Sequence, residues 1–466
     1  MGMNQPLREI ARRLRAGSLT AAALRREAAA NLESSEARLG AYKTVTVEVA
    51  EAAAARADAA FARGQDRGVL QGIPVSVKDI YGVPGVPIFA GSPRELPARW
   101  QAPGPLVACL LAQDAVVMGK THTVEFAFGA LGLNDHWPTP RNPWDAAVAR
   151  VPGGSSSGAG VSLCQGSALI ALGSDTSGSV RIPAALTGNV GYKPTIGRWS
   201  TAGITPLSLI FDTPGVLART VDDAMLAAAE MERHFGRTQA GIGGASLSSA
   251  LRIGIPESFF WDDCDAGISE PVRGALAELE RAGHRLVPLR FPEAALAFEI
   301  FKAGGTAGAE LLAFLRHELP EWVETLDRNV SARMNAAAEV SAVEFLGRRM
   351  SLERWSREAR AHFEHVDVIA TPTTAQSPPA FTELSSWEDY RPRNLKMARN
   401  TSIANLLQLA AITLPVGLDA LRLPVGLQVM ASHGRDDFLF AAAGAFEAVL
   451  GTGSQRIGFP PGLAPR

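Results

Sequence analysis

The chain has 466 residues, 47% of them hydrophobic and 20% charged, with a formal net charge of −2. This ordinary soluble composition argues against a general affinity for nucleic acid or anionic membranes, and no apolar run approaches the roughly 20 residues that span a bilayer. Three scattered cysteines are too few for a disulfide framework or a zinc site. We therefore expect a cytoplasmic protein in a reducing environment.

The N-terminal segment, up to about residue 64, is predicted to be helical. Ser18 is a candidate N-cap for the helix that follows it, and an Ala-rich stretch near residues 47–62 predicts another helix.

From residue 72 onward the chain alternates between strand and helix patterns. The predicted strands are 72–80, 115–121, 167–175, 251–256, 284–289, 366–373 and 423–431, and the predicted helices are 105–114, one that starts near 179, 271–283 and a long stretch from 293 to 365. Such alternation argues for an α/β sheet covered by helices on both faces. Gly, Ser and Thr are densest at strand ends in the middle third, where α/β proteins usually build their sites.

Lysine is rare in this sequence, because only six of the 45 basic residues are lysines. Lys78 stands in the apolar strand predicted at 72–80, where an arginine would serve equally well as a simple surface charge. A buried lysine can lose its proton, whereas an arginine in practice cannot. The choice of lysine at this position therefore points to chemistry.

Three segments carry candidate catalytic residues: 72–85 with Lys78, VPGGSSSGAG at 151–160, and GSDTSGSVRIP at 173–183. Each segment alone has an ordinary structural interpretation. A lysine at a strand end is usually a solvated edge charge, a GGSSSG run is usually a flexible loop, and a serine after glycine is usually a helix N-cap.

Together these segments resemble the amidase signature family of serine hydrolases, which includes fatty acid amide hydrolase, malonamidase and the A subunit of glutamyl-tRNA amidotransferase. The resemblance covers residues 72–220 and resumes weakly at 412–431. Within it, GKTHTVEFAFG at 119–129, RNPWD at 141–145 and the stretch 191–215 also look like the family.

The resemblance implies a Ser–Ser–Lys triad without histidine. Carried over by motif, Ser179 is the nucleophile, Ser155 the bridging serine and Lys78 the base, and a cis peptide bond is expected between Gly154 and Ser155. Burial at the end of an apolar strand lowers a lysine pKa, so that a neutral amine can accept the serine proton. The family uses no metal or cofactor in this reaction.

The turn around the nucleophile is expected to bind the developing oxyanion through the backbone N–H groups of Thr176, Ser177, Gly178 and Ser179. By the same resemblance, Asp175 and Arg181 brace this turn as a buried ion pair.

The sequence departs from the family pattern at two positions near the site. Ser177 stands where many relatives have glycine, which is acceptable if its φ is negative. His122 replaces a common asparagine, and it either contacts substrate or fills space.

Other interpretations of the motifs fit the sequence less well. Ser156 satisfies a Gly-x-Ser-x-Gly nucleophile elbow, which would imply an α/β-hydrolase esterase with a later histidine, although no clear strand precedes it. The Gly119-Lys120-Thr121 run lacks the earlier glycine of a phosphate loop, because Asp114 occupies that position. His362, Glu364 and His365 hint at a metal, but no CxxC pair or further ligand with useful spacing follows them, and a helix end before the strand predicted at 366–373 explains these residues.

We expect a single α/β domain, 1–466, with a mixed central sheet, an N-terminal helical segment at 1–64, a signature core at 70–220 and a variable substrate-side region at 290–390. The expected activity is hydrolysis of a C–N amide bond of a small molecule through an acyl-enzyme. The alternative is an amidotransferase A-type subunit that works with a partner chain. We expect no nucleic-acid or membrane contact, and homodimerisation is one option. Aromatic residues that flank the motifs are candidates for a substrate pocket or for the core: Phe126, Phe128, Trp137, Trp199 and Phe211.

Overall fold

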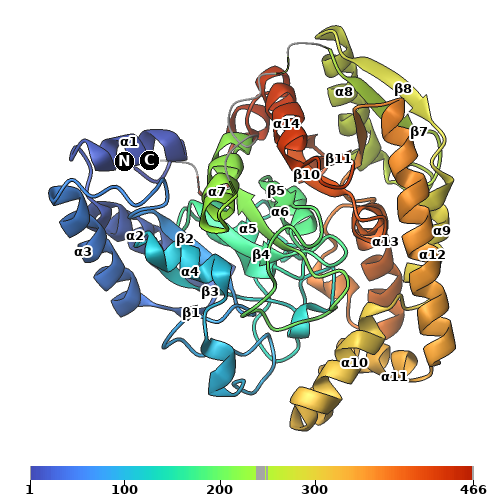
Figure 1. Ribbon diagram of the computed structural model, residues 1–466, viewed down its shortest axis with the longest axis horizontal. Helices are drawn as coiled ribbons and strands as arrows, with labels where there is room; N and C mark the ends of the chain where they lie inside the picture. The colour runs from blue at the N-terminus through green and yellow to red at the C-terminus, as the bar shows by residue number, and fades with distance from the viewer. Residues whose placement is uncertain (1, 238–246, 248–249, 464–466) are drawn as a thin grey trace.

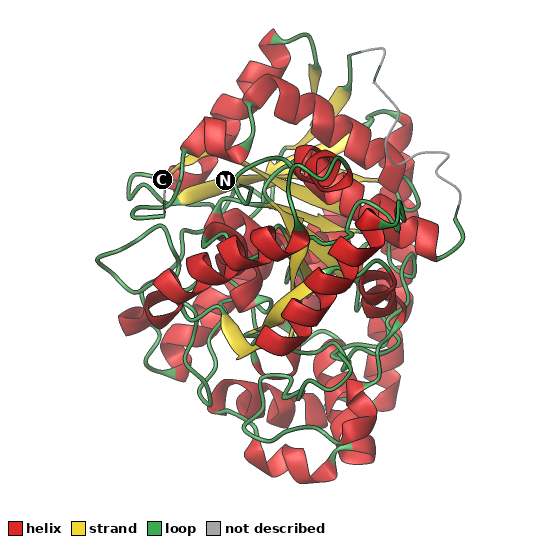
Figure 2. Ribbon diagram, turned by 90° about the vertical axis from the view of Figure 1, so that its left-hand side faces the viewer, coloured by secondary structure: helices red, strands yellow, loops and turns green. Residues whose placement is uncertain are grey.

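Eleven strands form one mixed sheet within the residues that this computed structural model describes, which are 2–237, 247 and 250–463. The strand order is β1-β3-β2-β4-β6-β5-β10-β11-β9-β7-β8. In chain order the strands are β1 (Tyr42–Val45), β2 (Pro74–Lys78), β3 (Val116–Thr121), β4 (Ile170–Ser174), β5 (Val190–Lys193), β6 (Pro214–Ala218), β7 (Arg252–Pro256), β8 (Arg285–Leu289), β9 (Val368–Pro372), β10 (Ala410–Leu418) and β11 (Pro424–Ala431). Figure 2 shows helices on both faces of the sheet, which confirms the predicted α/β class.

The α-helices lie around this sheet, with the N-terminal helices at one end of it and α8, α9 and α12 at the other (Figure 1). Their bounds are α1 (Leu7–Arg15), α2 (Ala21–Leu39), α3 (Val47–Ala62), α4 (Pro105–Ala112), α5 (Ser157–Cys164), α6 (Arg181–Thr187), α7 (Val221–His234), α8 (Ala266–Arg281), α9 (Pro292–Lys302), α10 (Ala307–Glu318), α11 (Arg328–Ala338), α12 (Ala342–Ala361), α13 (Trp387–Leu406), α14 (Asp436–Leu450) and α15 (Gly453–Ile457).

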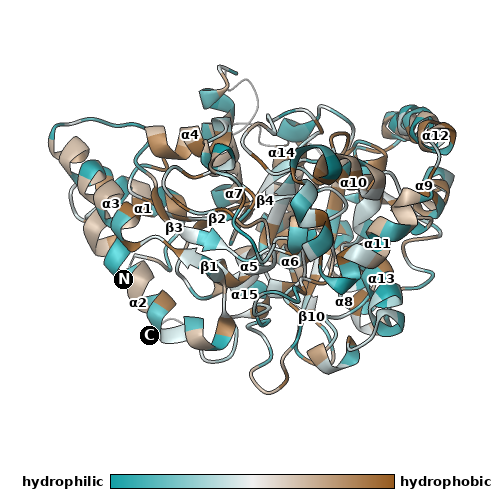
Figure 3. Cartoon of the chain, turned by 90° about the horizontal axis from the view of Figure 1, so that it is seen from below, coloured by the Kyte–Doolittle hydropathy of each residue, from teal (hydrophilic) through white to brown (hydrophobic). Residues whose placement is uncertain are grey.

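The centre of the sheet is covered on both sides. Every residue of β2, β3 and β4 is buried, as expected for parallel strands with helices on both faces. In Figure 3, hydrophobic segments gather around β2 and β3.

Two parallel strand ends place the candidate site. β4 runs parallel to β2, with Val77 opposite Leu172, so the carboxyl ends of the two strands meet at one edge of the sheet. Lys78 ends β2 and Ser174 ends β4. β3 is the other parallel neighbour of β2. Polar side chains at this edge therefore project from the ends of buried strands.

Two predictions for the N-terminal segment were wrong. Thr20 caps α2, since its hydroxyl accepts a hydrogen bond from the Ala23 N–H at 3.1 Å, and Ser18 does not. The short strand β1 interrupts the segment that was predicted to be helical, and it pairs with β3. A four-residue edge strand is too short to show a recognisable alternation of apolar and polar residues. The strand forms by pairing with β3, which lies far along the chain.

The long helical stretch predicted at 293–365 is divided into α9 to α12. Gly304 and Gly305, with φ of 101° and 62°, separate α9 from α10. Both glycines adopt the left-handed backbone that other residues disfavour, so the chain reverses there.

Gly158 in α5 offers a test of the packing behind the site. A Cβ at this position would lie 2.0 Å from the Ala41 carbonyl oxygen and 2.8 Å from the His122 nitrogen. We expect Gly158→Ala to lower the free energy of unfolding by about 1–3 kcal/mol or more, because backbone atoms cannot move aside as a flexible side chain can.

The matched control is Gly444→Ala in α14, where a Cβ meets nothing within 4 Å. We expect this change to raise stability by up to about 1 kcal/mol, because alanine favours helix over glycine. Urea unfolding of both variants is the measurement, and equal effects of the two substitutions would contradict the packing argument.

Candidate active site

Lys78 lies at the carboxyl end of β2 with its side chain fully buried. Its Nζ is 2.7 Å from the Ser155 Oγ and 2.8 Å from the Ser174 Oγ. Burial lowers the Lys78 pKa to about 7, while the negative charges of Asp212 and Asp175 act in the opposite direction. A lysine with this pKa is partly neutral at physiological pH and can accept a proton from a hydroxyl.

Ser155 is held by the loop that precedes α5. The peptide bond between Gly154 and Ser155 is cis, as the resemblance implied. The Gly154 N–H donates to the Ala130 carbonyl at 2.7 Å, and the Val124 N–H donates to the Ser155 carbonyl at 3.1 Å. The backbone on both sides of the Ser155 hydroxyl is therefore fixed while that hydroxyl faces Lys78.

Ser179 lies between β4 and α6, with 4% of its surface exposed. The Ser156 N–H donates to the Ser179 carbonyl at 3.3 Å, which brings the two serine segments side by side. No hydrogen bond joins the Ser179 and Ser155 hydroxyls in the part of the chain that the structure describes. Lys78, Ser155 and Ser179, which are far apart in sequence, thus lie together at one sheet edge.

Asp175 and Arg181 form the buried ion pair that the resemblance implied. The Arg181 Nη2 donates to the Asp175 Oδ1 at 2.9 Å, and its Nε donates to Oδ2 at 3.0 Å. Burial by itself raises the Asp175 pKa, but the charge and hydrogen bonds of Arg181, together with the Lys193 charge and the Asn405 hydrogen bond, outweigh it and lower the pKa to about 2. The Val180 N–H also donates to Asp175, at 3.2 Å, so this carboxylate holds the whole turn in shape.

One of the four expected oxyanion donors is used elsewhere. The Gly178 N–H donates to the Asp175 Oδ1 at 2.8 Å, so it is not free to bind an oxyanion. Among the described residues, the N–H groups of Thr176, Ser177 and Ser179 make no such bond. Gly178 has a φ of 130°, whereas Ser177 is outside the positive-φ region, so serine is tolerated there.

Sequence reasoning missed several residues that complete the site. Ser174 contacts Lys78, and Asp212 accepts a hydrogen bond from the Thr176 hydroxyl at 2.6 Å. Burial raises the Asp212 pKa to about 6. Asp212 lies in the stretch 191–215, which resembles the family. An acidic residue within that stretch could therefore have been proposed as part of the site from the sequence.

Two further missed residues come from distant elements. Asn405 on α13 accepts from the Arg181 Nη2 at 2.6 Å, and Gln428 on β11 accepts from Nη1 of the same guanidinium. Asn405 also donates to the Asp175 carbonyl at 2.9 Å. No local pattern links these residues to the turn, because both approach it only through the fold.

Most of the aromatic candidates serve the core. Phe126, Trp199 and Phe211 are buried, and the Trp199 Nε1 donates to Glu232 at 2.6 Å. Phe128 and Trp137 are only half-buried. His122 is buried, which lowers its pKa to about 4 and keeps it neutral at pH 7.

The rival motifs find ordinary structural surroundings. The Ser156 Oγ lies 3.4 Å from both the backbone nitrogen and the carbonyl oxygen of Ser174. The His362 Nε2 lies 3.1 Å from the Glu293 Oε2. Within the described ranges no group of three or more His, Cys, Asp or Glu side chains is arranged to hold a metal ion. None of the helices in those ranges is both long and apolar enough to cross a bilayer.

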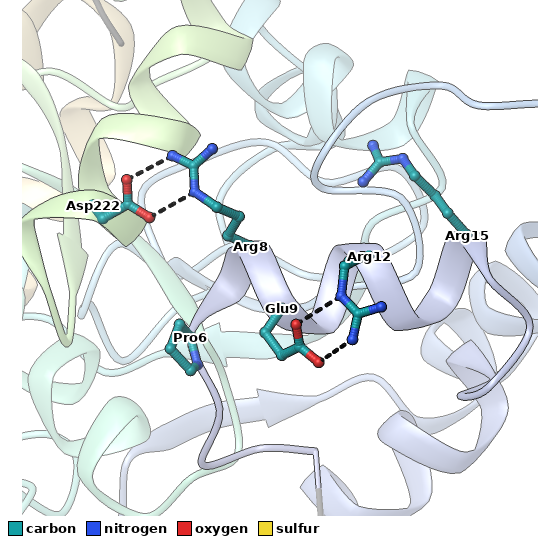
Figure 4. Close-up of a pocket in the computed structure, with 6 residues that line it drawn as sticks. All are labelled: Pro6, Arg8, Glu9, Arg12, Arg15 and Asp222. Atoms are coloured by element: carbon teal, nitrogen blue, oxygen red, sulfur yellow. Dashed lines mark hydrogen bonds and ion pairs between the residues drawn. The ribbon is translucent and has the colours of Figure 1, made fainter. Parts of the chain in front are cut away.

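A hollow of about 540 Å³ lies elsewhere, at α1 and the start of α7. Figure 4 shows its lining, in which Arg8 pairs with Asp222 and Arg12 pairs with Glu9. These cations already have partners, and none of the predicted catalytic residues lines the hollow.

Comparison with known proteins places this geometry in context. A sequence model of the amidase family matches residues 23–440. The chain is 50% identical to 2-amino-5-chloromuconic acid deaminase of Comamonas testosteroni, over 97% of this chain and 98% of that protein. It is 32% identical to the A subunit of the glutamyl-tRNA(Gln) amidotransferase of Anaeromyxobacter dehalogenans, over 96% of each chain. A crystal structure of an amidase superposes with a TM-score of 0.85 at 28% identity and covers 96% of this chain and 100% of the other.

The pair of Asp175 and Arg181 can be tested by stability. We expect Asp175→Asn to lower the free energy of unfolding by about 3–5 kcal/mol, because it leaves a buried guanidinium without its counter-charge. The control is Glu9→Gln, which breaks the exposed pair with Arg12 and is expected to leave stability nearly unchanged, because solvent screens this pair. Chemical unfolding at pH 7 is the measurement, and similar small effects of both changes would show that the buried pair does not hold the turn.

Proposed function

The chain belongs to the amidase family, and we propose that it hydrolyses a C–N amide bond of a small molecule with Ser179 as nucleophile, Ser155 as bridging serine and Lys78 as base. The observation that carries this assignment is the buried Lys78 amine, 2.7 Å from the Ser155 hydroxyl, beside the segment that bears Ser179. The proposed reaction needs no group from outside the chain except water.

In the first half-reaction the Ser179 Oγ attacks the amide carbonyl carbon. Its proton passes to the Ser155 Oγ as Ser155 gives its own proton to the neutral Lys78 Nζ. The relay then runs in reverse and protonates the leaving nitrogen, the C–N bond breaks, and ammonia or an amine departs. An ester between the acyl group and Ser179 remains.

In the second half-reaction a water molecule attacks the ester carbonyl and gives its proton to the same relay. The bond between the acyl carbon and the Ser179 Oγ breaks, Ser179 regains its proton, and the carboxylic acid leaves. We assign the oxyanion of both tetrahedral intermediates to the N–H groups of Thr176, Ser177 and Ser179. The Thr176 contact with Asp212 supports this assignment, since it fixes the first of these residues.

A second candidate reaction is deamination of an unsaturated amino acid. It is favoured by the 50% identity to a protein named for 2-amino-5-chloromuconic acid deaminase. Deamination also breaks a C–N bond, takes up water and releases ammonia, so the same base and the same proton relay can serve it. Ammonia release from 2-amino-5-chloromuconic acid and from a panel of simple amides, measured side by side, separates the two reactions.

The amidotransferase alternative calls for a partner chain. The 32% identity to the A subunit of such an enzyme supports it, and the formal net charge of −2 favours a protein that does not contact nucleic acid. Ammonia release by the purified chain alone would support a stand-alone hydrolase.

We also propose a cytoplasmic location. We further propose homodimerisation, and size-exclusion chromatography coupled to light scattering tests it by measuring the molar mass.

The nucleophile assignment is tested by two neighbouring serines. We expect Ser179→Ala to abolish both amide hydrolysis and labelling by a fluorophosphonate probe, because the attacking oxygen is removed. Ser156→Ala is the matched control and should retain labelling at Ser179. A probe adduct located on Ser156 by peptide mass spectrometry would instead support the nucleophile-elbow mechanism and refute the triad.

The base assignment predicts a pH dependence. The neutral form of Lys78 is the active one, so kcat/KM should rise about tenfold per pH unit below pH 7 and level off above it. In Asp212→Asn the midpoint should move to lower pH, because the negative charge that raises the Lys78 pKa is lost.

Circular dichroism over the same pH range is the necessary control. Lys193 is also buried, and its pKa is lowered to about 7, so folding itself can respond to pH in this range. A midpoint that stays in place in Asp212→Asn while the fold is intact would show that Lys78 does not set the profile.

A further inference from the structure

Arg333 on α11 is a partly buried cation at the substrate-side region of the fold. Its guanidinium carbon lies 3.6 Å from the centre of the Phe128 ring, and its Nη2 donates to the Phe128 carbonyl. Its Nε donates to the Asn329 carbonyl at 3.3 Å. Burial lowers the Arg333 pKa, which indicates that solvent supports this charge poorly. Arg333 is nevertheless only half-buried, and its Nη1, which has no hydrogen-bond partner among the described residues, keeps some contact with solvent.

No carboxylate within the described residues lies within 4.0 Å of the Arg333 nitrogens. The nearby Asp327 uses its side chain to cap α11, where it accepts from the N–H groups of Asn329 and Val330. By contrast, buried Arg181 has Asp175, and half-buried Arg198 has Glu232 and Asp436. Charges that are taken out of water are normally paired, so Arg333 has the surroundings of a cation that receives its counter-charge from a ligand.

The segment 124–130, which contains the Phe128 that Arg333 contacts, also forms hydrogen bonds with the backbone around Ser155. Two residues after Phe128, the Ala130 carbonyl accepts from the Gly154 N–H at 2.7 Å, and Gly154 precedes Ser155. Earlier in the same segment, Val124 donates to the Ser155 carbonyl at 3.1 Å. The loop 124–130 therefore has the bridging serine at one side and the Arg333 guanidinium at the other.

The helices that bring Arg333 to this loop also close around it. A Cβ at Gly308 on α10 would lie 3.6 Å from the Phe128 ring, so α10 approaches the ring closely. From α13, the Asn394 Oδ1 accepts from the Ala130 N–H at 2.8 Å and from the Tyr390 hydroxyl at 3.1 Å. Phe128 and Arg333 thus lie against α10 and α11 of the variable region, where substrate specificity is expected, and α13 beyond that region holds the end of the same loop.

We propose that Arg333 binds a carboxylate of the substrate, so that the preferred substrates carry an acid group at the end of the molecule opposite the scissile C–N bond. This inference rests on the proposed function. Within the described residues the Nη1 edge of Arg333 makes no hydrogen bond, and a planar guanidinium suits bidentate binding of a carboxylate. Phe128 supplies an apolar, aromatic surface beside it for the carbon chain that joins the two ends of the substrate.

The test compares acid amides with neutral amides of the same chain length. The pairs are succinamic acid with butyramide, glutaramic acid with pentanamide, and adipamic acid with hexanamide. For the wild-type chain we expect the acid member of at least one pair to have the higher kcat/KM. In Arg333→Met the ratio of acid to neutral kcat/KM should fall by about 10- to 100-fold, chiefly through KM, because a charged hydrogen-bonded pair is lost.

Two further variants separate binding from folding. Arg333→Lys keeps the charge without the planar fork, and it should recover part of the ratio. Arg273 on α8 is an exposed arginine whose guanidinium carbon lies 4.4 Å from the centre of the Trp261 ring. Arg273→Met should leave the ratio of acid to neutral kcat/KM unchanged. If Arg333→Met lowers kcat/KM for acid and neutral amides equally, Arg333 only supports the Phe128 loop and the proposal is wrong.

A binding measurement distinguishes failure of this proposal from failure of the proposed function. Isothermal titration with adipate and with cis,cis-muconate does not require turnover. Binding by the wild-type chain that is weakened about 10-fold or more in Arg333→Met supports the carboxylate site even if no amide is hydrolysed. Absence of binding by the wild-type chain, together with equal hydrolysis of acid and neutral amides, would overturn it.

Discussion

The removal of the Lys78 amine from water is the interaction on which the candidate site depends. β2 is buried along its whole length, so the strand that ends in Lys78 leaves its ammonium no solvent, and its pKa falls to about 7. The hydroxyls of Ser155 and Ser174 replace water as hydrogen-bond partners without adding a counter-charge that would restore the ordinary pKa. The sheet that buries the lysine therefore also allows it to act as the base of the proposed reaction.

The buried carboxylate of Asp175, unlike the Lys78 amine, is stabilised in its charged form. Asp175 stays ionised because Arg181, the Gly178 N–H and the Asn405 amide all donate to it. This carboxylate holds the turn that presents Ser179, and it takes up the Gly178 N–H in doing so. Two ionisable groups at neighbouring positions thus have separate roles, since the unpaired lysine can exchange a proton and the paired carboxylate keeps its charge.

The loop 124–130 connects chemistry with selectivity. It contacts the backbone on either side of the cis peptide before Ser155, and the same loop presents Phe128 to Arg333. Helices α10, α11 and α13 surround this end of the loop, so changes in the helical region can alter the proposed carboxylate site while the strand ends that bear Lys78 and Ser174 stay fixed. A rigid sheet edge combined with a helical substrate side allows one reaction to serve different acids or amides.

The sequence by itself predicted the strands β2, β3, β4, β7, β8, β9 and β11, the α/β class and the motif residues Lys78, Ser155, Ser179, Asp175 and Arg181, because strand periodicity and the family resemblance are properties of short stretches. The strands β5, β6 and β10 at the middle of the sheet were not predicted. It could not reveal β1, whose four residues become a strand only by pairing with β3. Nor could it reveal that Gly178 donates to Asp175, that Asn405 and Gln428 accept from Arg181, or that Arg333 contacts Phe128. Those contacts join residues far apart in the chain, and only the packing of the helices and strands brings such partners within hydrogen-bond distance.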